Sequence, residues 1–190
     1  WPESTARFQT GRHWAYQPLH AARPPQVRDT HWLQSSIDAF IRSPQEAAGI
    51  TPAPPADKRT LIRRATFDLT GLPPTPAEVD AFLQDDGPGA FAAVVDRLLA
   101  SPAYGEHWGR HWLDVVRYAD TAGETADYPV PLAWRYRNYV IDAFNRDKPY
   151  DEFLCEQLAG DILAAEQPRE RYAELATATG FLAISRRFGF

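Results

Sequence analysis

The sequence predicts an all-α fold: an irregular bundle of about six to seven helices with an extended N-terminal arm. Apolar residues recur three and four positions apart in most segments after residue 56, which is the spacing of one helix face. No segment shows the sustained apolar–polar alternation of a half-buried strand. Capping residues and prolines precede several of the periodic segments, as they do at helix N-termini.

The N-terminal part, residues 1–36, is predicted to be an extended arm that packs on the domain. Its prolines exclude a long helix. Its aromatic residues supply anchors: Trp1, Trp14, Tyr16 and Trp32. We expect a short helix to begin at 37–41 and to break before Pro44, with a turn over 49–55 after it. Residues 37–190 are expected to form a single helical domain, as the N-terminal part of a longer protein.

The rest of the chain supplies the helices of the bundle. Asp57 is a good N-cap for the first of them. Thr75 and Glu78 form a capping-box pattern at the start of the second. The expected helices lie at about 58–70, 76–84, 89–100, 102–119, 132–146, 150–163 and 168–184. The segment 121–131 contains two prolines and is expected to be a loop.

Composition and charge narrow the possible functions. The net charge of −5 at pH 7 argues against a nucleic-acid partner, which would require a basic face. No apolar run approaches the ~20 residues that span a bilayer, so a membrane-spanning protein is not expected. Cys155 is the only cysteine, which excludes an internal disulfide. The chain has no CxxCH motif and cannot by itself attach a c-type haem covalently.

The segment 104–120, YGEHWGRHWLDVVRYAD, carries the strongest candidates for chemistry. On a helix His107, His111 and Asp114 project side by side, because residues three and four apart share a face. Two histidines at this spacing with a carboxylate one turn on can bind one metal ion, and Asp120 closes the run. The opposite side of the helix is expected to be buried: Trp108, Trp112, Val115 and Val116.

A metal site is one of several interpretations of this segment. The HExxH motif of zinc proteases is absent, because Trp108 stands where its general base would be. His111 can instead be structural and hydrogen-bond a loop carbonyl. Carboxylates between 106 and 127 can line a cleft for acid–base chemistry, or cap helices and pair with arginines.

The run 134–139, WRYRNY, interleaves aromatic residues with arginines. Such a run can bind a sugar or a polyanion through stacking and charge-assisted hydrogen bonds. Alternatively, it is one face of a packed helix whose arginines bridge to carboxylates. Arg117 is likewise expected to face carboxylates from 121–131 or 147–161, since a partly buried guanidinium needs partners.

Four long segments of this chain resemble one known family, the planctomycete-type secreted cytochrome-associated domain. The segments are HWAYQPL, DKRTLIRRATFDLTGLPPTPAEVDAFL, VDRLLASPAYGEHWGRHWLDVVRYADT and YRNYVIDAFNRDKPYDEFLCEQLAGDIL. The family is a domain of unknown function that usually occurs with cytochrome c domains. The resemblance covers most of residues 13–184.

The resemblance implies a secreted or periplasmic bacterial protein with redox or electron-transfer activity. In the family a CxxCH motif follows the segment matched by FLAISRRF, so haem c is expected in the full-length protein, on a segment beyond this chain. The expected partners are a downstream domain or a second chain of the same protein, and an electron-transfer partner.

The resemblance also selects among the candidate residues. His111, Trp112 and Arg117 fit the family pattern and are the candidate cofactor-binding residues, with His111 as an axial haem ligand or a donor beside the haem. Family members commonly carry Arg where this chain has His107. The candidate metal ligands are therefore His111, Asp114 and Asp120.

Two other functions remain open. One is a polysaccharide-binding or polysaccharide-processing module, which the run 134–139 and the carboxylates of 106–127 favour. The other is a structural or assembly domain without chemistry of its own, which the aromatic arm and the apolar C-terminal segment FLAISRRFGF favour.

Overall fold

The computed structural model describes residues 17–122, 127–165 and 167–183. Contacts between Cα atoms divide the chain into two compact units, 1–55 and 56–190, and each is described by itself. The predicted boundary after residue 36 stays a prediction. Three of the expected anchors of the arm, Trp1, Trp14 and Tyr16, lie outside the described residues.

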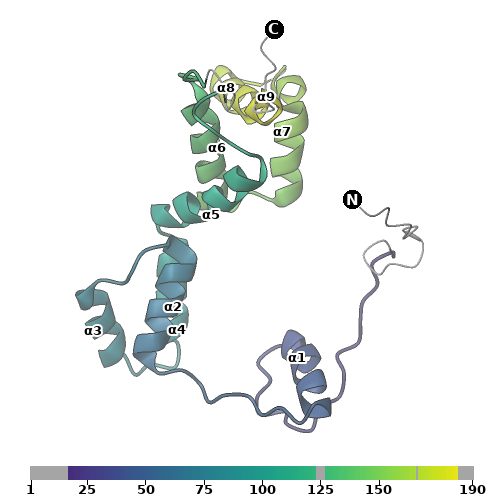
Figure 1. Ribbon diagram of the computed structural model, residues 1–190, viewed down its shortest axis with the longest axis vertical. Helices are drawn as coiled ribbons and strands as arrows, with labels where there is room; N and C mark the ends of the chain where they lie inside the picture. Colours follow the sequence, from purple (N-terminus) through teal and green to yellow (C-terminus); the bar gives the residue numbers. More distant parts are fainter. Residues whose placement is uncertain (1–16, 123–126, 166, 184–190) are drawn as a thin grey trace. The chain divides into compact units, whose positions relative to one another are not determined.

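The regular structure of the described residues is helical (Figure 1). Within them the β structure consists of one isolated bridge, between Thr121 and Pro129. The all-α prediction is confirmed. Among the described helices, none has the length and apolar character that crossing a membrane requires.

The first unit contains one helix, α1 (Ser36–Ala47), and it continues through Pro44. The predicted break before Pro44 is therefore wrong. A proline removes only its own N–H from the helix ladder, and the N–H of Ala48 still donates to the Pro44 carbonyl at 3.0 Å. An ion pair between Arg42 and Glu46, 3.4 Å apart, also spans the proline.

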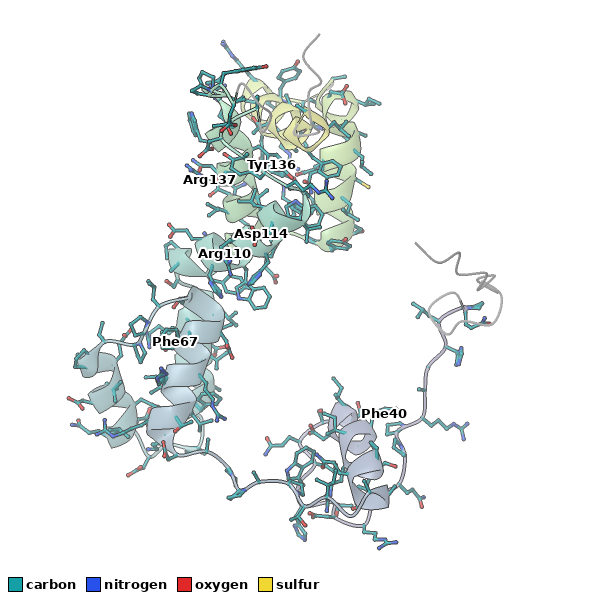
Figure 2. All side chains as sticks on the ribbon, viewed as in Figure 1. Phe40, Phe67, Arg110, Asp114, Tyr136 and Arg137 are labelled. Carbon is teal, nitrogen blue, oxygen red and sulfur yellow. The ribbon has the colours of Figure 1, made fainter. Side chains whose placement is uncertain are left out.

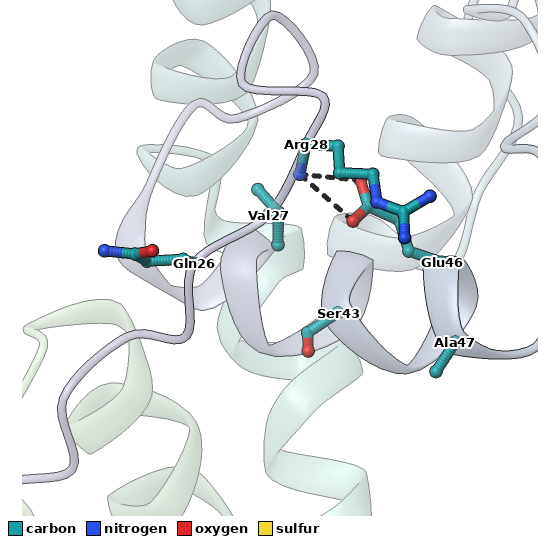
Figure 3. A pocket seen from close by; sticks show the side chains of 6 residues that line it. All are labelled: Gln26, Val27, Arg28, Ser43, Glu46 and Ala47. Atoms are coloured by element: carbon teal, nitrogen blue, oxygen red, sulfur yellow. Dashed lines mark hydrogen bonds between the residues drawn. The ribbon is translucent and has the colours of Figure 1, made fainter.

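The carboxylate of Glu46 ties α1 to the extended segment before it (Figure 3). It accepts hydrogen bonds from the backbone N–H of Arg28, at 3.1 and 3.0 Å, and of Asp29, at 3.1 Å. These backbone hydrogen bonds hold the pKa of Glu46 below its usual range. An open pocket beside them is lined by Gln26, Val27, Arg28, Ser43, Glu46 and Ala47.

The second unit contains the remaining helices of the described residues. They are α2 (Lys58–Thr70), α3 (Pro76–Gln84), α4 (Ala90–Leu99), α5 (Pro102–Val115), α6 (Ala133–Asn145), α7 (Tyr150–Ala164), α8 (Arg169–Ala178) and α9 (Gly180–Ala183). Two predicted caps are confirmed. The Asp57 side chain accepts from the N–H of Thr60 at 2.7 Å, and Thr75 forms the capping box with Glu78.

Two apolar clusters form the core of this unit. One lies among α2, α3 and α4, and its buried members are Ile62, Phe82, Ala90, Val94 and Leu98. The other lies among α6, α7 and α8, and its buried members are Tyr136, Tyr139, Val140, Ala143, Phe153 and Ala178.

Helix α5 packs against one helix of each cluster, α2 and α6 (Figure 1). Its Trp108 indole N–H donates to the carbonyl of Asp68 in α2 at 3.1 Å. The N–H of Gly105 donates to the side-chain oxygen of Asn145 in α6 at 2.8 Å. The helix that carries the candidate residues is therefore also the one that joins the two clusters.

Two helix boundaries differ from the prediction. Helix α5 ends at Val115 instead of 119, because Arg117 adopts a left-handed backbone (φ 57°) and the N–H of Tyr118 turns back to the carbonyl of Leu113 at 2.9 Å. The predicted last helix is divided into α8 and α9, with Thr179 between them.

Candidate functional site

Three rings on one side of α5 contact one another: His107, Trp108 and His111. We call this group the ring edge. The centroid of the His111 ring lies 5.4 Å from that of His107 and 5.3 Å from that of Trp108. Trp108 remains 37% exposed and His111 is exposed. The ring edge therefore offers imidazole and indole groups to an approaching molecule.

The ring edge is held against the C-terminal end of α2. A Cβ atom on Gly71 would lie 2.4 Å from Nδ1 of His107, and Gly71 has a φ of 71°. Only glycine meets both demands without strain.

Each of the three candidate metal ligands contacts a different group of the protein. His111 makes ring contacts, and among the described residues its imidazole has no hydrogen-bond partner. Asp114 is exposed and pairs with Arg110 at 3.7 Å on the same helix (Figure 2). Asp120 accepts the hydroxyl hydrogen of Tyr118. In the described part of the chain no three His, Cys, Asp or Glu residues are grouped as ligands of one ion, and the set stays a prediction.

Trp112, a candidate cofactor-binding residue, lies on the inner side of α5. Its indole N–H points to the hydroxyl of Tyr136 at 3.0 Å and to the side-chain oxygen of Gln157 at 3.2 Å. Its ring packs edge-on against Phe153, with centroids 4.9 Å apart. Burial raises the pKa of Tyr136 to about 12. Trp112 therefore packs on α6 and α7 and is not part of the ring edge.

The predicted buried face of α5 is only partly correct. Trp112 and Val116 are half-buried, but Trp108 is 37% and Val115 is 75% exposed. The buried side is centred on Gly105 and on Gly109, both of which face α6. Two small residues four apart let the helices approach closely, and this rotates Trp108 and Val115 towards the flanks.

Arg117, the third candidate for cofactor binding, follows the end of α5 and is exposed. Among the described residues its side chain has no ion pair, so the expected carboxylate partner is not found there; Glu124, the acid nearest to it in the loop, lies outside them. The neighbouring Tyr118 donates to Asp120, and burial together with this carboxylate raises the pKa of Tyr118.

A buried ionic network that the sequence did not reveal connects α6, α7 and α8. At its centre is Glu156, 1% exposed, which binds Lys148 and Arg171 and accepts the hydroxyl hydrogen of Tyr139 at 2.8 Å. Glu174 pairs with the same two cations, at 3.2 Å and 2.8 Å. Burial and the neighbouring Glu156 raise the pKa of Tyr139.

The network could have been suspected from one signal only. Glu156 follows Phe153 by three residues and so shares the buried face of α7. A buried acid on an apolar face predicts cationic partners, but its partners are eight and fifteen residues away in the sequence. Both carboxylate oxygens of Glu156 accept hydrogen bonds within the network. The network therefore holds the helices together, and the Glu156 carboxylate is not free for chemistry.

The aromatic–arginine run is divided between core and surface. Tyr136 and Tyr139 are buried, which agrees with the packed-helix interpretation. Trp134 stays 45% exposed, with the Arg135 guanidinium 5.7 Å from its ring centroid. Arg137 bonds its neighbour Asn138 at 3.3 Å (Figure 2). Few exposed aromatic rings therefore remain here for a sugar.

A model of one protein family matches residues 36–188, most of the chain; its description is "PSCyt2: Protein of unknown function (DUF1549)". The chain belongs to the PSCyt2 family. The resemblance to the cytochrome-associated domain is thereby confirmed. Searches of curated proteins and of solved structures gave no match.

The PSCyt2 match spans α1, the ring edge of α5 and the Glu156 network. These two groups of residues differ in what they can do. The central pair of the network, the side chains of Glu156 and Lys148, is buried, and both oxygens of Glu156 have partners. The ring edge is accessible and contains an imidazole with free hydrogen-bonding capacity among the described residues. In this PSCyt2 domain the ring edge is therefore the better candidate for contact with a ligand or partner.

Proposed function

We propose that this PSCyt2 domain is the helical, haem-free part of a secreted electron-transfer system and docks a c-type haem group through the ring edge of α5. The observation that carries the proposal is the exposed imidazole of His111, which stands beside Trp108 outside both apolar clusters. The family name and the resemblance to cytochrome-associated domains support it.

The exposed residues of the ring edge have the chemistry to bind a haem that is carried by another segment or chain. Neutral imidazole is a common axial ligand of haem iron, and an aromatic side chain such as Trp108 can pack against a porphyrin. The sequence has no CxxCH motif, so covalent attachment falls to another segment or chain. When bound, the haem would supply the one-electron chemistry. The part of this chain is to bind and orient it.

A spectroscopic titration tests the proposal. A soluble ferric c-type cytochrome is added to the chain while the Soret band and tryptophan fluorescence are recorded. We expect both signals to change for the wild type, and His111→Ala to lose the response. His31→Ala, which removes an exposed histidine of the first unit, is the matched control and should behave as the wild type.

Two outcomes would reject the proposal at different levels. An unchanged titration of His111→Ala would remove the ring edge as the docking site. If the wild type gives no response, and the product of the complete gene, expressed with haem-maturation machinery, shows no Soret band, the electron-transfer function is rejected.

A second function, an assembly domain without chemistry, is favoured by exposed aliphatic residues on α7. Leu158 is 59%, Ile162 73% and Leu163 46% exposed. Such a row can lie across the same row of a second copy of the chain, because a two-fold interface is self-complementary. Light scattering after size exclusion should then show a dimer that Ile162→Lys dissociates and Asp161→Lys, the adjacent exposed control, does not. A monomeric wild type would exclude this function.

A further inference from the structure

Two exposed residues that are not glycine occupy left-handed positions just after a helix. Arg117 follows α5 with φ 57°, and Asp147 follows α6 with φ 49°. Both stand in Schellman motifs, in which the next residue donates back into the helix: Tyr118 to Leu113 at 2.9 Å and Lys148 to Ala143 at 3.0 Å.

Glycine is the residue that this position normally favours. Gly71 takes it after α2, with φ 71°. Asp tolerates the left-handed region better than most residues do, whereas a long side chain such as Arg is uncommon there. Arg117 therefore keeps an unfavourable backbone conformation, and strain of this kind concentrates at functional positions.

The contacts of the described residues do not explain an arginine at this position. Among the described residues the Arg117 guanidinium has neither an ion pair nor a hydrogen bond. The two carboxylates nearest in the described sequence are engaged elsewhere, Asp114 with Arg110 at 3.7 Å and Asp120 with Tyr118. Within the described part of the chain, the Arg117 guanidinium is therefore available to a ligand.

We propose that Arg117 is a recognition residue for a carboxylate group of the docking partner. The planar guanidinium binds a carboxylate through two parallel hydrogen bonds. The charge of Arg137 acts on the adjacent Tyr118 and adds positive potential at this place. The inference rests on the proposed function. The carboxylate can come from a haem propionate or from an acidic side chain, and these two sources share the same chemistry.

The test compares Arg117→Gly with the matched control Asp147→Gly. Each glycine relieves the left-handed backbone, so each variant should melt at a higher temperature than the wild type, by roughly 2–4 °C for Arg117→Gly and by less for Asp147→Gly. Binding is followed by tryptophan fluorescence with three probes: haem c undecapeptide, its propionate dimethyl ester, and hexaglutamate. Arg117→Gly should bind the probe whose carboxylate Arg117 recognises, either the undecapeptide or hexaglutamate, about ten-fold more weakly than the wild type does, because a charge-assisted pair is lost. Asp147→Gly should bind as the wild type does.

The three probes distinguish the source of the carboxylate. If esterification of the undecapeptide weakens binding as much as Arg117→Gly does, the ligand is the propionate. If only hexaglutamate binding depends on Arg117, the ligand is an acidic side chain of the partner. Arg117→Lys should recover part of the affinity, since it restores the charge without the bidentate geometry.

Several results would overturn the inference. One is that Arg117→Gly binds every probe as tightly as the wild type does. Another is that the wild type binds none of the three probes. A third is that Arg117→Gly melts at a lower temperature than the wild type, which would give the side chain a structural role. Failure of the proposed function is distinguishable. In that case c-type cytochrome gives no response with the wild type, while hexaglutamate still binds in an Arg117-dependent way, and the inference stands alone.

Discussion

At the scale of single residues, three donors converge on one buried carboxylate, that of Glu156. Its oxygens accept from Lys148, Arg171 and Tyr139. Burial alone acts to lower the pKa of Arg171, but hydrogen bonds and charges of Glu174 and Glu156 raise it on balance. The same cations hold the pKa of Glu174 below its usual range against the opposing effect of burial.

Replacement of Glu156 should destabilise the protein strongly. Glu156→Gln leaves the almost buried Lys148, whose side chain is 7% exposed, with one carboxylate fewer. Removal of one member of a buried ion pair costs roughly 3 kcal/mol or more, because a buried charge is left uncompensated. Urea unfolding followed by circular dichroism measures the loss. The control is Glu152→Gln, whose carboxylate also pairs with Arg171 but is 47% exposed, and it should cost under about 1 kcal/mol. Equal losses in the two variants would contradict the prediction.

Tyr136 makes stability depend on pH in the alkaline range. Burial raises its pKa from 10.0 to about 12 in the folded protein. The protonated phenol is favoured by folding, so this contribution is complete below pH 10.0 and is lost as the pH rises towards about 12. The free energy of unfolding should fall between pH 10.0 and about pH 12, and should fall less steeply in Tyr136→Phe. Identical slopes for the two proteins would show that Tyr136 is not responsible.

At the scale of elements, α5 packs on α6, bonds to α2 and presents exposed side chains. Gly105 and Gly109 face α6, and Trp108 bonds the end of α2. His111 is exposed beside Trp108, and Arg117 is exposed just after the helix ends. The position of the ring edge therefore depends on how closely α5 and α6 approach each other.

Replacement by alanine should have different effects on stability at the two glycines of α5. A Cβ on Gly105 would lie 2.5 Å from the Ile141 carbonyl oxygen and from Asn145 Cγ, so Gly105→Ala should destabilise by about 1–3 kcal/mol. A Cβ on Gly109 would lie 3.4 Å from Ile141 Cγ1. Gly109→Ala should therefore be neutral or stabilising by up to ~1 kcal/mol through helix propensity. Thermal unfolding of both variants checks the pair, and a harmless Gly105→Ala would contradict the close approach.

At the scale of the whole molecule, the two apolar clusters draw all their buried members from one unit. Their buried residues lie between Ile62 and Ala178, and none comes from the described residues 17–55. Each cluster is small, and α5 contacts helices of both.

A fragment of residues 56–190 should fold without the first unit. We expect it to keep the helical circular dichroism of the corresponding residues and a cooperative thermal transition, because its hydrophobic cores are complete. Amide exchange by mass spectrometry should give similar protection of α6 and α7 in the fragment and in the whole chain. A fragment that lacks a cooperative transition would show that residues 1–55 contribute to its core.

The sequence by itself determined the features that depend on neighbours three or four residues apart. The helical class, the Asp57 cap and the Thr75–Glu78 capping box were predicted correctly, because each of these is a local interaction. The family resemblance, carried by long segments, was confirmed as well.

Only the tertiary structure decided the features that depend on contacts between distant segments. The partners of Glu156 come from three elements, and no local pattern links them. The buried side of α5 is set by the close contact of Gly105 with α6, which exposes Trp108 and Val115 against expectation. The left-handed Arg117 ends the same helix early. Apolar spacing identifies a helix and its approximate face, but the steric fit between two helices determines which side chains remain accessible to a partner.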